Sequence, residues 1–212
     1  MPPSLTERSL AHGARQLARS DPHLAVVLSR HGTPPLWGRE PGFPTLVQII
    51  LEQQVSLASG RAAFARLERV AGEVAPERVA AFSEARLRTA GLTRQKAAYI
   101  SELARAVVRG EFSVAALASL DDERAHAELV KLKGIGPWSA DIYLLMALRR
   151  RDVWPRHDLA LAAAMREVKR LRSLPSPERQ LEIAEAWRPW RAVAARVLWH
   201  HYLSTPRPRT RL

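Results

Sequence analysis

Residues 132–140 read LKGIGPWSA, a pattern that indicates how the chain on either side of it folds. Gly134 and Gly136 flank one aliphatic residue directly before Pro137, and proline favours the first turn of a helix. Glycines allow positive φ and let backbone N–H groups approach an anion, and the start of the following helix offers unsatisfied donors to the same anion. The pattern predicts a glycine hairpin between two helices, suited to a phosphate. From the glycines alone, a plain turn between helices stays open as the alternative.

Helical patterns extend in both directions from this hairpin. Apolar residues recur at helical spacing between capping residues and glycines, whereas no segment shows the alternation of a strand. We therefore predict an all-α protein. Its helices are expected from Ser4 to Arg19, from Phe43 through Ile50, from Ser56 past Val70, from Ser83 to Gly91, from Thr93 to Gly110, from Asp121 or Asp122 to Leu132, from Trp138 to Arg150, from Asp158 to Leu171, from Ser176, and from Pro189 to near Ser204.

The composition is that of a folded protein without cysteine. Of the 212 residues, 47% are hydrophobic and 25% are charged, which excludes wholesale disorder and collagen-like fibres. The absence of cysteine excludes disulfides, thiolate zinc sites, cysteine-ligated iron–sulfur clusters and cysteine nucleophiles. No apolar run is long enough to span a bilayer, and the N-terminus has no signal-peptide core. We therefore expect a cytoplasmic protein with no membrane partner.

The charge balance indicates a polyanionic partner. The formal net charge is +12, and residues 149–212 hold 15 basic against 6 acidic side chains, compared with 18 against 15 in residues 1–148. Nucleic acid is the commonest polyanion inside a cell. Arginine outnumbers lysine by 29 to 4, so a codon bias of the genome stays open as a second explanation.

Four blocks of sequence together resemble the helix-hairpin-helix DNA glycosylases, and within them the 3-methyladenine DNA glycosylase II branch. They are IILEQQVS at 49–56, the hairpin at 129–140, DVWPRHDLAL at 152–161 and AWRPWR at 186–191, and their order and spacing agree over residues 43–203. The resemblance implies the two-lobed fold of that family. A central helical bundle at 43–153 would end in the hairpin, and residues 1–42 with 154–212 would form a second helical lobe that carries the catalytic aspartate. The active-site cleft is expected between the lobes.

Asp158 occupies the position of that catalytic aspartate. Breaking an N-glycosidic bond develops oxocarbenium character on the deoxyribose, which a carboxylate stabilises while it orients or deprotonates the attacking water. A cationic alkylated purine is a good leaving group, so a second carboxyl is not needed as an acid. Bifunctional members carry a lysine where this chain has Trp138, and we therefore expect a hydrolase without lyase activity. A plain helix N-cap is the alternative role for Asp158, and the two roles are compatible.

The resemblance also implies a pocket for the extruded base. Trp138 and Trp190 match aromatic positions of the branch, where an indole attracts a cationic purine by stacking and cation–π interaction. Ile142 stands where the best-known member has an aromatic residue, which would alter the breadth of the pocket. Trp187 and Trp199 are assigned to the core, which is also the alternative for the first two tryptophans.

Gln54 matches the wedge residue, which fills the gap left in the duplex when a nucleotide is flipped out. A glutamine there can also hydrogen-bond to the orphaned opposing base. An ordinary polar residue at a helix end is the alternative. Gln53 and Ser56 are expected to cap and brace the same loop.

At the hairpin, the resemblance implies contacts to the DNA backbone and a cation site. The residues expected to bind the backbone are Lys131, Lys133, Gly134 and Gly136. The backbone carbonyls expected to hold a structural monovalent cation, Na⁺ or K⁺, are those of Val130, Leu132 and Ile135. No cofactor is expected for catalysis. The seven histidines show no spacing typical of a transition-metal site.

The resemblance, together with these residues, implies a monofunctional DNA glycosylase that removes alkylated purines, of the 3-methyladenine and 7-methylguanine type, from duplex DNA by base flipping and so initiates base excision repair. Its partner would be double-stranded DNA that contains alkylated bases, and a monomer is the simplest state. Two alternatives stay open: a glycosylase for other damaged purines, such as hypoxanthine or etheno-adenine, and a non-catalytic helix-hairpin-helix DNA-binding protein. Asp158 in its motif argues against the second of these, whereas no motif distinguishes the lesions.

Overall fold

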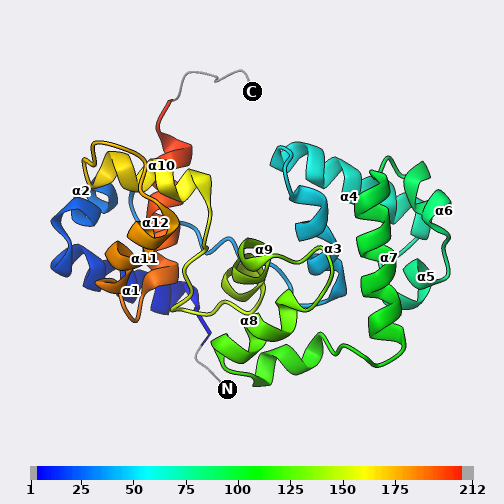
Figure 1. The fold of residues 1–212 in the computed structure, drawn as a ribbon. Helices are drawn as coiled ribbons and strands as arrows, with labels where there is room; N and C mark the ends of the chain where they lie inside the picture. Colours follow the sequence, from blue (N-terminus) through cyan, green and yellow to red (C-terminus); the bar gives the residue numbers. More distant parts are fainter. Residues whose placement is uncertain (1–3, 207–212) are drawn as a thin grey trace. The chain divides into compact units, whose positions relative to one another are not determined.

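The computed structural model describes residues 4–206, and within this range the chain forms helices and one isolated antiparallel bridge, between Ser4 and Arg150 (Figure 1). The prediction of an all-α protein is confirmed. The elements are α1 (Glu7–Ser20), α2 (Pro22–His31), α3 (Phe43–Glu52), α4 (Leu57–Ala71), α5 (Pro76–Ala80), α6 (Glu84–Thr89), α7 (Arg94–Val108), the 3-10 turn η1 (Ala115–Ser119), α8 (Asp122–Val130), α9 (Pro137–Ile142), the π-helical turn η2 (Tyr143–Ala147), α10 (Leu159–Val168), α11 (Pro177–Glu185) and α12 (Arg191–Ser204). Among residues 4–206, no helix combines the length and the apolar character needed to cross a membrane.

Capping side chains set most of the helix starts. A hydroxyl or carboxylate oxygen before the helix accepts a hydrogen bond from a backbone N–H three positions later, which satisfies one of the donors that the first turn leaves unpaired. This bond is present at six of the residues from which the sequence predicted helices to begin, namely Ser56, Ser83, Thr93, Asp121, Asp158 and Ser176. The helix predicted from Ser4 instead begins at Glu7, with Thr6 as its cap. Pro137 is the first residue of α9, as predicted.

The described residues form two compact units. The first unit is Arg39–Leu148, which contains every element from α3 to η2. The second unit consists of residues 4–38 and 149–206, which contain α1, α2, α10, α11 and α12. Within the second unit, the carbonyl of Arg149 accepts a hydrogen bond of 2.7 Å from the N–H of Leu5. This bond joins the segment 4–38 to the start of the segment 149–206.

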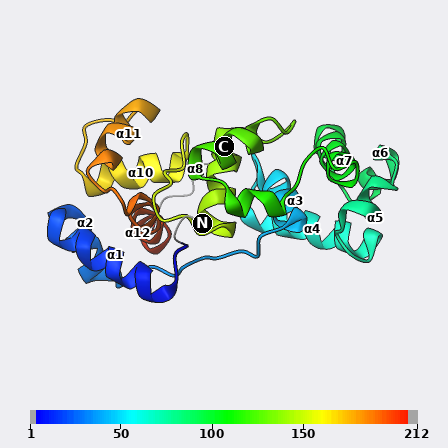
Figure 2. The same cartoon turned by 90° about the horizontal axis from the view of Figure 1, so that it is seen from below.

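In the first unit, α3 packs on α4 and α7, and α7 packs on α5 and α6 (Figure 2). Helix α3 is buried along most of its length, because seven of its ten residues are apolar. Gly60 of α4 lies directly against Glu52 at the end of α3, where a β-carbon would stand only 2.9 Å from the Cα of Glu52. The buried carboxylate of Glu52 pairs with Arg39 at 2.8 Å. Helix α9 of the hairpin contacts both α8 and α3, so the hairpin is fixed to the same core.

Helix α12 is the central helix of the second unit, and it contacts α1, α2, α10 and α11 (Figure 1). Every residue from Ala192 to Trp199 is buried, including Arg196. The Arg196 guanidinium donates hydrogen bonds to the carbonyls of Leu36 at 2.7 Å and Ala192 at 3.0 Å, and burial lowers the pKa of Arg196 to about 10. A helix that is buried all round is held in one orientation by its neighbours.

Several elements differ from the expectations drawn from the sequence. Helices α2 and α5 were not predicted, although Asp21 accepts hydrogen bonds from the first N–H groups of α2. The helix expected from Trp138 to Arg150 is α-helical only to Ile142 and continues as the π-helical turn η2. The last helix begins at Arg191, with Trp190 at its N-cap position, rather than at Pro189.

Candidate active site

Glycine stands at the two hairpin positions for different structural reasons. Gly134 has φ +87°, a conformation that side chains with a β-carbon rarely adopt, and a β-carbon there would collide with the ring of Tyr99. Gly136 has φ −86°, and a β-carbon there would meet nothing within 4 Å. The fold therefore requires a glycine at Gly134. At Gly136 the missing side chain instead leaves open space in front of the first turn of α9.

The hairpin lysines are exposed and engaged in surface ion pairs. Lys131 pairs with Glu128 at 2.6 Å, and Lys133 pairs with Glu102 at 3.0 Å. Both lysine side chains are about two-thirds exposed, and ion pairs of this kind contribute little to stability. A phosphate can therefore replace the carboxylates at small cost. 

The loop between α3 and α4 carries Gln54, the predicted wedge residue. Gln54 is exposed and has φ +56°, the left-handed region that is costly for a residue other than glycine. Gln53 braces the loop, as predicted, because its Nε2 donates hydrogen bonds of 2.8 Å to the Gly134 carbonyl and to Ser139 Oγ. Ser56 accepts a hydrogen bond from the N–H of Ser59 and so begins α4. The loop that carries Gln54 is thus joined to the glycine hairpin by the side chain of Gln53.

Asp158 lies at the N-terminus of α10 in the second unit and is only 8% exposed. Its Oδ1 accepts a hydrogen bond of 2.8 Å from the N–H of Leu161. The N-cap role is therefore present. The same oxygen lies 3.4 Å from Nε1 of Trp199, which donates to it from α12.

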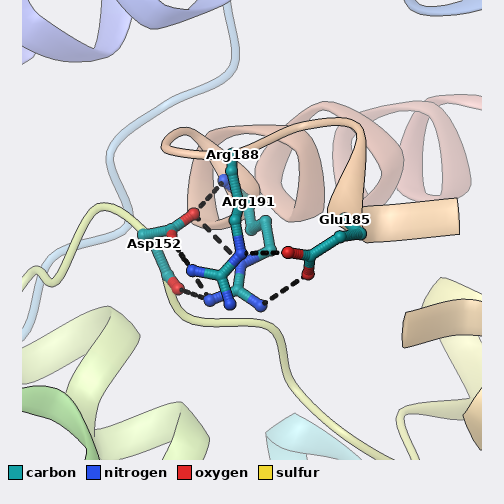
Figure 3. A network of polar contacts seen from close by, with 4 residues as sticks. All are labelled: Asp152, Glu185, Arg188 and Arg191. Atoms are coloured by element: carbon teal, nitrogen blue, oxygen red, sulfur yellow. Dashed lines mark hydrogen bonds and ion pairs between the residues drawn. The ribbon is translucent and has the colours of Figure 1, made fainter. Parts of the chain in front are cut away.

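An ion-pair network holds the connector that leads to Asp158 (Figure 3). Asp152 accepts hydrogen bonds from Arg188 at 2.8 Å and from Nε of Arg191 at 3.0 Å, and Arg191 also donates to the Asp152 carbonyl at 2.7 Å. Glu185 pairs with Arg188 at 2.6 Å and lies 3.8 Å from Arg191. The start of the connector is thereby fixed to the start of α12, the helix that carries Trp199. Asp152 belongs to the same sequence block as Asp158, but no role was predicted for it from the sequence.

The structure places the Trp190 ring against α1. A β-carbon on Gly13 would stand 2.6 Å from the Trp190 ring, and the His12 ring lies 5.6 Å from it between centroids. The Arg151 guanidinium lies 5.4 Å from the same indole. Trp190 also lines a hollow of about 330 Å³ between α1 and the turn before α12. The indole of Trp199, which was predicted to lie in the core, donates to Asp158.

The other predicted pocket residues divide between surface and core. Trp138 is partly exposed on α9, whereas Ile142, one turn later, is buried at 3% exposure. Both belong to the first unit. Trp187 is buried in the second unit, as predicted, where its Nε1 donates a hydrogen bond of 2.7 Å to Asp21. The base-pocket roles of Trp138, Ile142 and Trp190 stay predictions.

No group of three or more histidine, cysteine, aspartate or glutamate side chains within residues 4–206 is arranged to hold a metal ion. The hairpin does offer backbone oxygen atoms. Val130 is the last residue of α8, and the Leu132 carbonyl accepts a hydrogen bond of 3.0 Å from the Ile135 N–H. A carbonyl oxygen has two lone pairs, so this bond leaves acceptor capacity at Leu132.

Comparison with known proteins identifies related sequences and folds. Residues 47–190 match a family model described as HhH-GPD superfamily base excision DNA repair protein. A Bacillus subtilis protein named DNA-3-methyladenine glycosylase is 27% identical over 196 residues, which are 87% of this chain and 65% of that protein. The chain spans just under two thirds of the length of its Bacillus subtilis relatives.

Two solved structures share the fold. The crystal structure of a DNA-3-methyladenine glycosidase from Bacillus halodurans superimposes with a TM-score of 0.80 at 25% identity and covers 91% of this chain and 89% of its own. The Schizosaccharomyces pombe 3-methyladenine DNA glycosylase Mag1, solved in complex with abasic DNA, gives a TM-score of 0.77 at 23% identity over 89% of this chain and 95% of its own.

Proposed function

Because the chain belongs to the HhH-GPD superfamily of base excision DNA repair proteins, we propose that it is a DNA glycosylase that hydrolyses the N-glycosidic bond of alkylated purines in duplex DNA. The proposed substrates are of the 3-methyladenine and 7-methylguanine type, a choice supported by the names of the Bacillus relatives. The observation that carries the proposal is Asp158, a buried carboxylate whose Oδ1 is oriented by the N–H of Leu161 and the indole of Trp199.

The proposed reaction needs one carboxylate. The bond between the purine and C1′ of the deoxyribose breaks, and the electron pair leaves with the base and neutralises its positive charge. Asp158 stabilises the cationic sugar and orients the water that adds to C1′, and it accepts the proton that the water loses. The Trp199 Nε1–H orients the carboxylate of Asp158, and we assign the partly exposed Trp138 to stacking on the extruded base.

The proposed contacts to DNA come from the first unit. The open space at Gly136 would admit a phosphate to the N–H groups at the start of α9, and Lys131 and Lys133 would exchange their carboxylate partners for phosphate oxygens. Exposed Gln54 would fill the gap left by the flipped nucleotide. We propose that the protein acts on double-stranded DNA as a monomer.

A structural Na⁺ or K⁺ at the hairpin is part of the proposal. The carbonyls of Val130, Leu132 and Ile135 would hold it, because backbone oxygen atoms suit hard cations of this kind. When bound, such an ion adds positive charge at the surface that meets the phosphate. Catalysis itself is proposed to need no cofactor.

The proposed enzyme is a hydrolase without lyase activity. A lyase step of this family needs an amine that attacks the sugar and forms an imine. Trp138 stands at the position where the bifunctional members have a lysine, and an indole nitrogen is not a nucleophile of this type. The product would therefore be an uncleaved strand with an abasic site.

The test is single-turnover release of bases from methylated duplex DNA by the wild type and by Asp158→Asn. Asparagine is also a good N-cap, so the variant should fold and bind DNA like the wild type, while release of 3-methyladenine falls by about 100- to 10,000-fold. Melting temperature and affinity for duplex DNA are the controls. Equal release by both proteins would mean that Asp158 is only a cap.

The same experiment distinguishes the alternatives. A wild type that binds duplex DNA and releases no alkylated purine is then offered duplexes that contain hypoxanthine or etheno-adenine. Release of either base would assign another lesion, and release of none would leave a DNA-binding protein without glycosylase activity.

A further inference from the structure

We propose that Lys96 is a positioning residue for the wedge loop, residues 53–56, and that its ammonium group sets how well this loop enters the duplex. The inference rests on the proposed function, because the loop matters in this way only if the protein flips a nucleotide. Lys96 lies in α7, which belongs to none of the four sequence blocks that indicated a glycosylase.

Lys96 is bonded to the backbone where α3 ends. Its Nζ donates hydrogen bonds to the carbonyl of Leu51 at 2.8 Å and to the carbonyl of Gln53 at 2.9 Å. The last carbonyls of a helix have no partner within the helix, and a cation there also interacts favourably with the helix dipole. One side chain therefore completes the C-terminus of α3 and fixes the first residue of the wedge loop.

The loop is held at two further points. The Gln53 side chain bonds to the Gly134 carbonyl and to Ser139, so the loop follows the glycine hairpin. Ser56 is fixed by its N-cap bond at the start of α4. Between these anchors, Gln54 and Val55 present exposed side chains, and Val55 is 46% exposed although it is apolar.

These anchors explain how Gln54 keeps its left-handed backbone. A non-glycine residue at φ +56° persists only where its surroundings impose the conformation. Lys96 and Gln53 impose it from the residue directly before Gln54. A loop that is already ordered pays little further entropy when it inserts into DNA, whereas a loose loop must be ordered on binding. Loss of the Lys96 bonds should therefore weaken insertion more than it weakens the grip on the phosphates.

The test compares Lys96→Met, which keeps the length of the side chain without its donors, with Lys96→Arg, which restores donors. Arg66→Met is the matched control: Arg66 also donates to a helix-end carbonyl of the first unit, that of Ala90 at 2.9 Å, but in α4 and toward α6. The probe is a duplex with a stable abasic-site analogue opposite 2-aminopurine, whose fluorescence rises when the wedge loop unstacks it. This readout needs no chemistry, so it is independent of base release.

We expect Lys96→Met, which removes both hydrogen bonds, to lose most of the fluorescence gain at saturating protein and to release 3-methyladenine from duplex DNA about tenfold more slowly. Release from methylated single strands should be unchanged, because no gap has to be filled there. Lys96→Arg should recover part of both signals, and Arg66→Met should match the wild type. In a Gln54→Ala background, Lys96→Met should add little, because both changes act on the same loop.

A wild-type gain in fluorescence that Lys96→Met retains in full would overturn the positioning role. Equal slowing on duplex and single strands would also overturn it, since that pattern indicates a general loss of structure. A fluorescence gain that depends on Lys96 in a protein that releases no base would instead support the positioning role and reject the proposed glycosylase.

Discussion

The indole Nε1 of Trp199 lies 3.4 Å from Oδ1 of Asp158, and the same oxygen accepts a 2.8 Å hydrogen bond from the Leu161 N–H. One donor comes from the helix that Asp158 begins, and the other comes from the central helix of the second unit. The carboxylate cannot turn about its side chain without losing both bonds. A carboxylate that is already oriented before the substrate binds stabilises a developing cation well, because it does not have to reorient during the reaction.

Trp199 and Trp190 therefore give different predictions when each is changed to phenylalanine. Trp199→Phe keeps an aromatic face and removes the donor to Asp158, so single-turnover release should slow by about tenfold. Trp190→Phe removes packing against Gly13, and its main effect should be a loss of about 1–2 kcal/mol in the free energy of unfolding. Release assays and chemical denaturation of both variants check this. If Trp190→Phe causes the larger loss of release, Trp190 lines the base pocket as the sequence predicted.

The hairpin glycines should respond differently to alanine. Gly134→Ala places a β-carbon against Tyr99 in a left-handed backbone, so the free energy of unfolding should fall by about 2–4 kcal/mol. Gly136→Ala meets open space and should leave stability within about 0.5 kcal/mol. Its expected effect is weaker binding to undamaged duplex DNA, measured by fluorescence anisotropy. Unchanged affinity in Gly136→Ala would show that no DNA phosphate binds at the N-terminus of α9.

Local signals predict much of this fold because a cap and the donors that it satisfies lie within three residues of each other. Ser56, Thr93 and Asp158 could be recognised for that reason. Asp21 before Pro22 is a signal of the same kind. However, α2 follows α1 without an intervening loop and precedes a proline-rich segment, so its helical pattern was not distinguished from the segments beside it.

The site was less predictable because its contacts join residues that are distant in sequence. Lys96 bonds to a carbonyl 43 positions earlier, and no local pattern marks it. Trp199 lies in a helix that is buried on all sides, where periodicity cannot show which face is turned toward Asp158. The sequence predicts a base-pocket role for Trp190, whereas the bond of Trp199 to Asp158 becomes visible only in the packing of α12.

Asp152 should influence release although it is not assigned to the chemistry. Asp152→Asn weakens the bonds to Arg188 and Arg191 that hold the connector before Asp158, so the free energy of unfolding should fall by about 2 kcal/mol and release should slow severalfold. Glu185→Gln is the control, since Glu185 is 60% exposed and surface pairs contribute less than about 1 kcal/mol. Denaturation and release assays on both variants measure this. Equal losses would show that the network acts as a whole rather than through the connector.

Asp21 gives the protein a predictable response to acid. Burial raises the pKa of Asp21, but hydrogen bonds from Lys169 at 2.8 Å and from Trp187 at 2.7 Å outweigh it, so the pKa lies below its ordinary value. The unfolded chain therefore binds the Asp21 proton more tightly than the folded protein. The stability that ionised Asp21 contributes is present above its ordinary pKa and is lost as the pH falls through its lowered pKa.

Asp21→Asn should lower the free energy of unfolding by about 2 kcal/mol near pH 7, because Lys169 loses its partner. The difference from the wild type should shrink between about pH 5 and pH 2. Glu182→Gln, which breaks the exposed pair with Arg179, should show no such convergence. Urea denaturation at several pH values measures both, and a cost for Asp21→Asn that stays constant down to about pH 2 would show that the charge of Asp21 is not what stabilises the second unit.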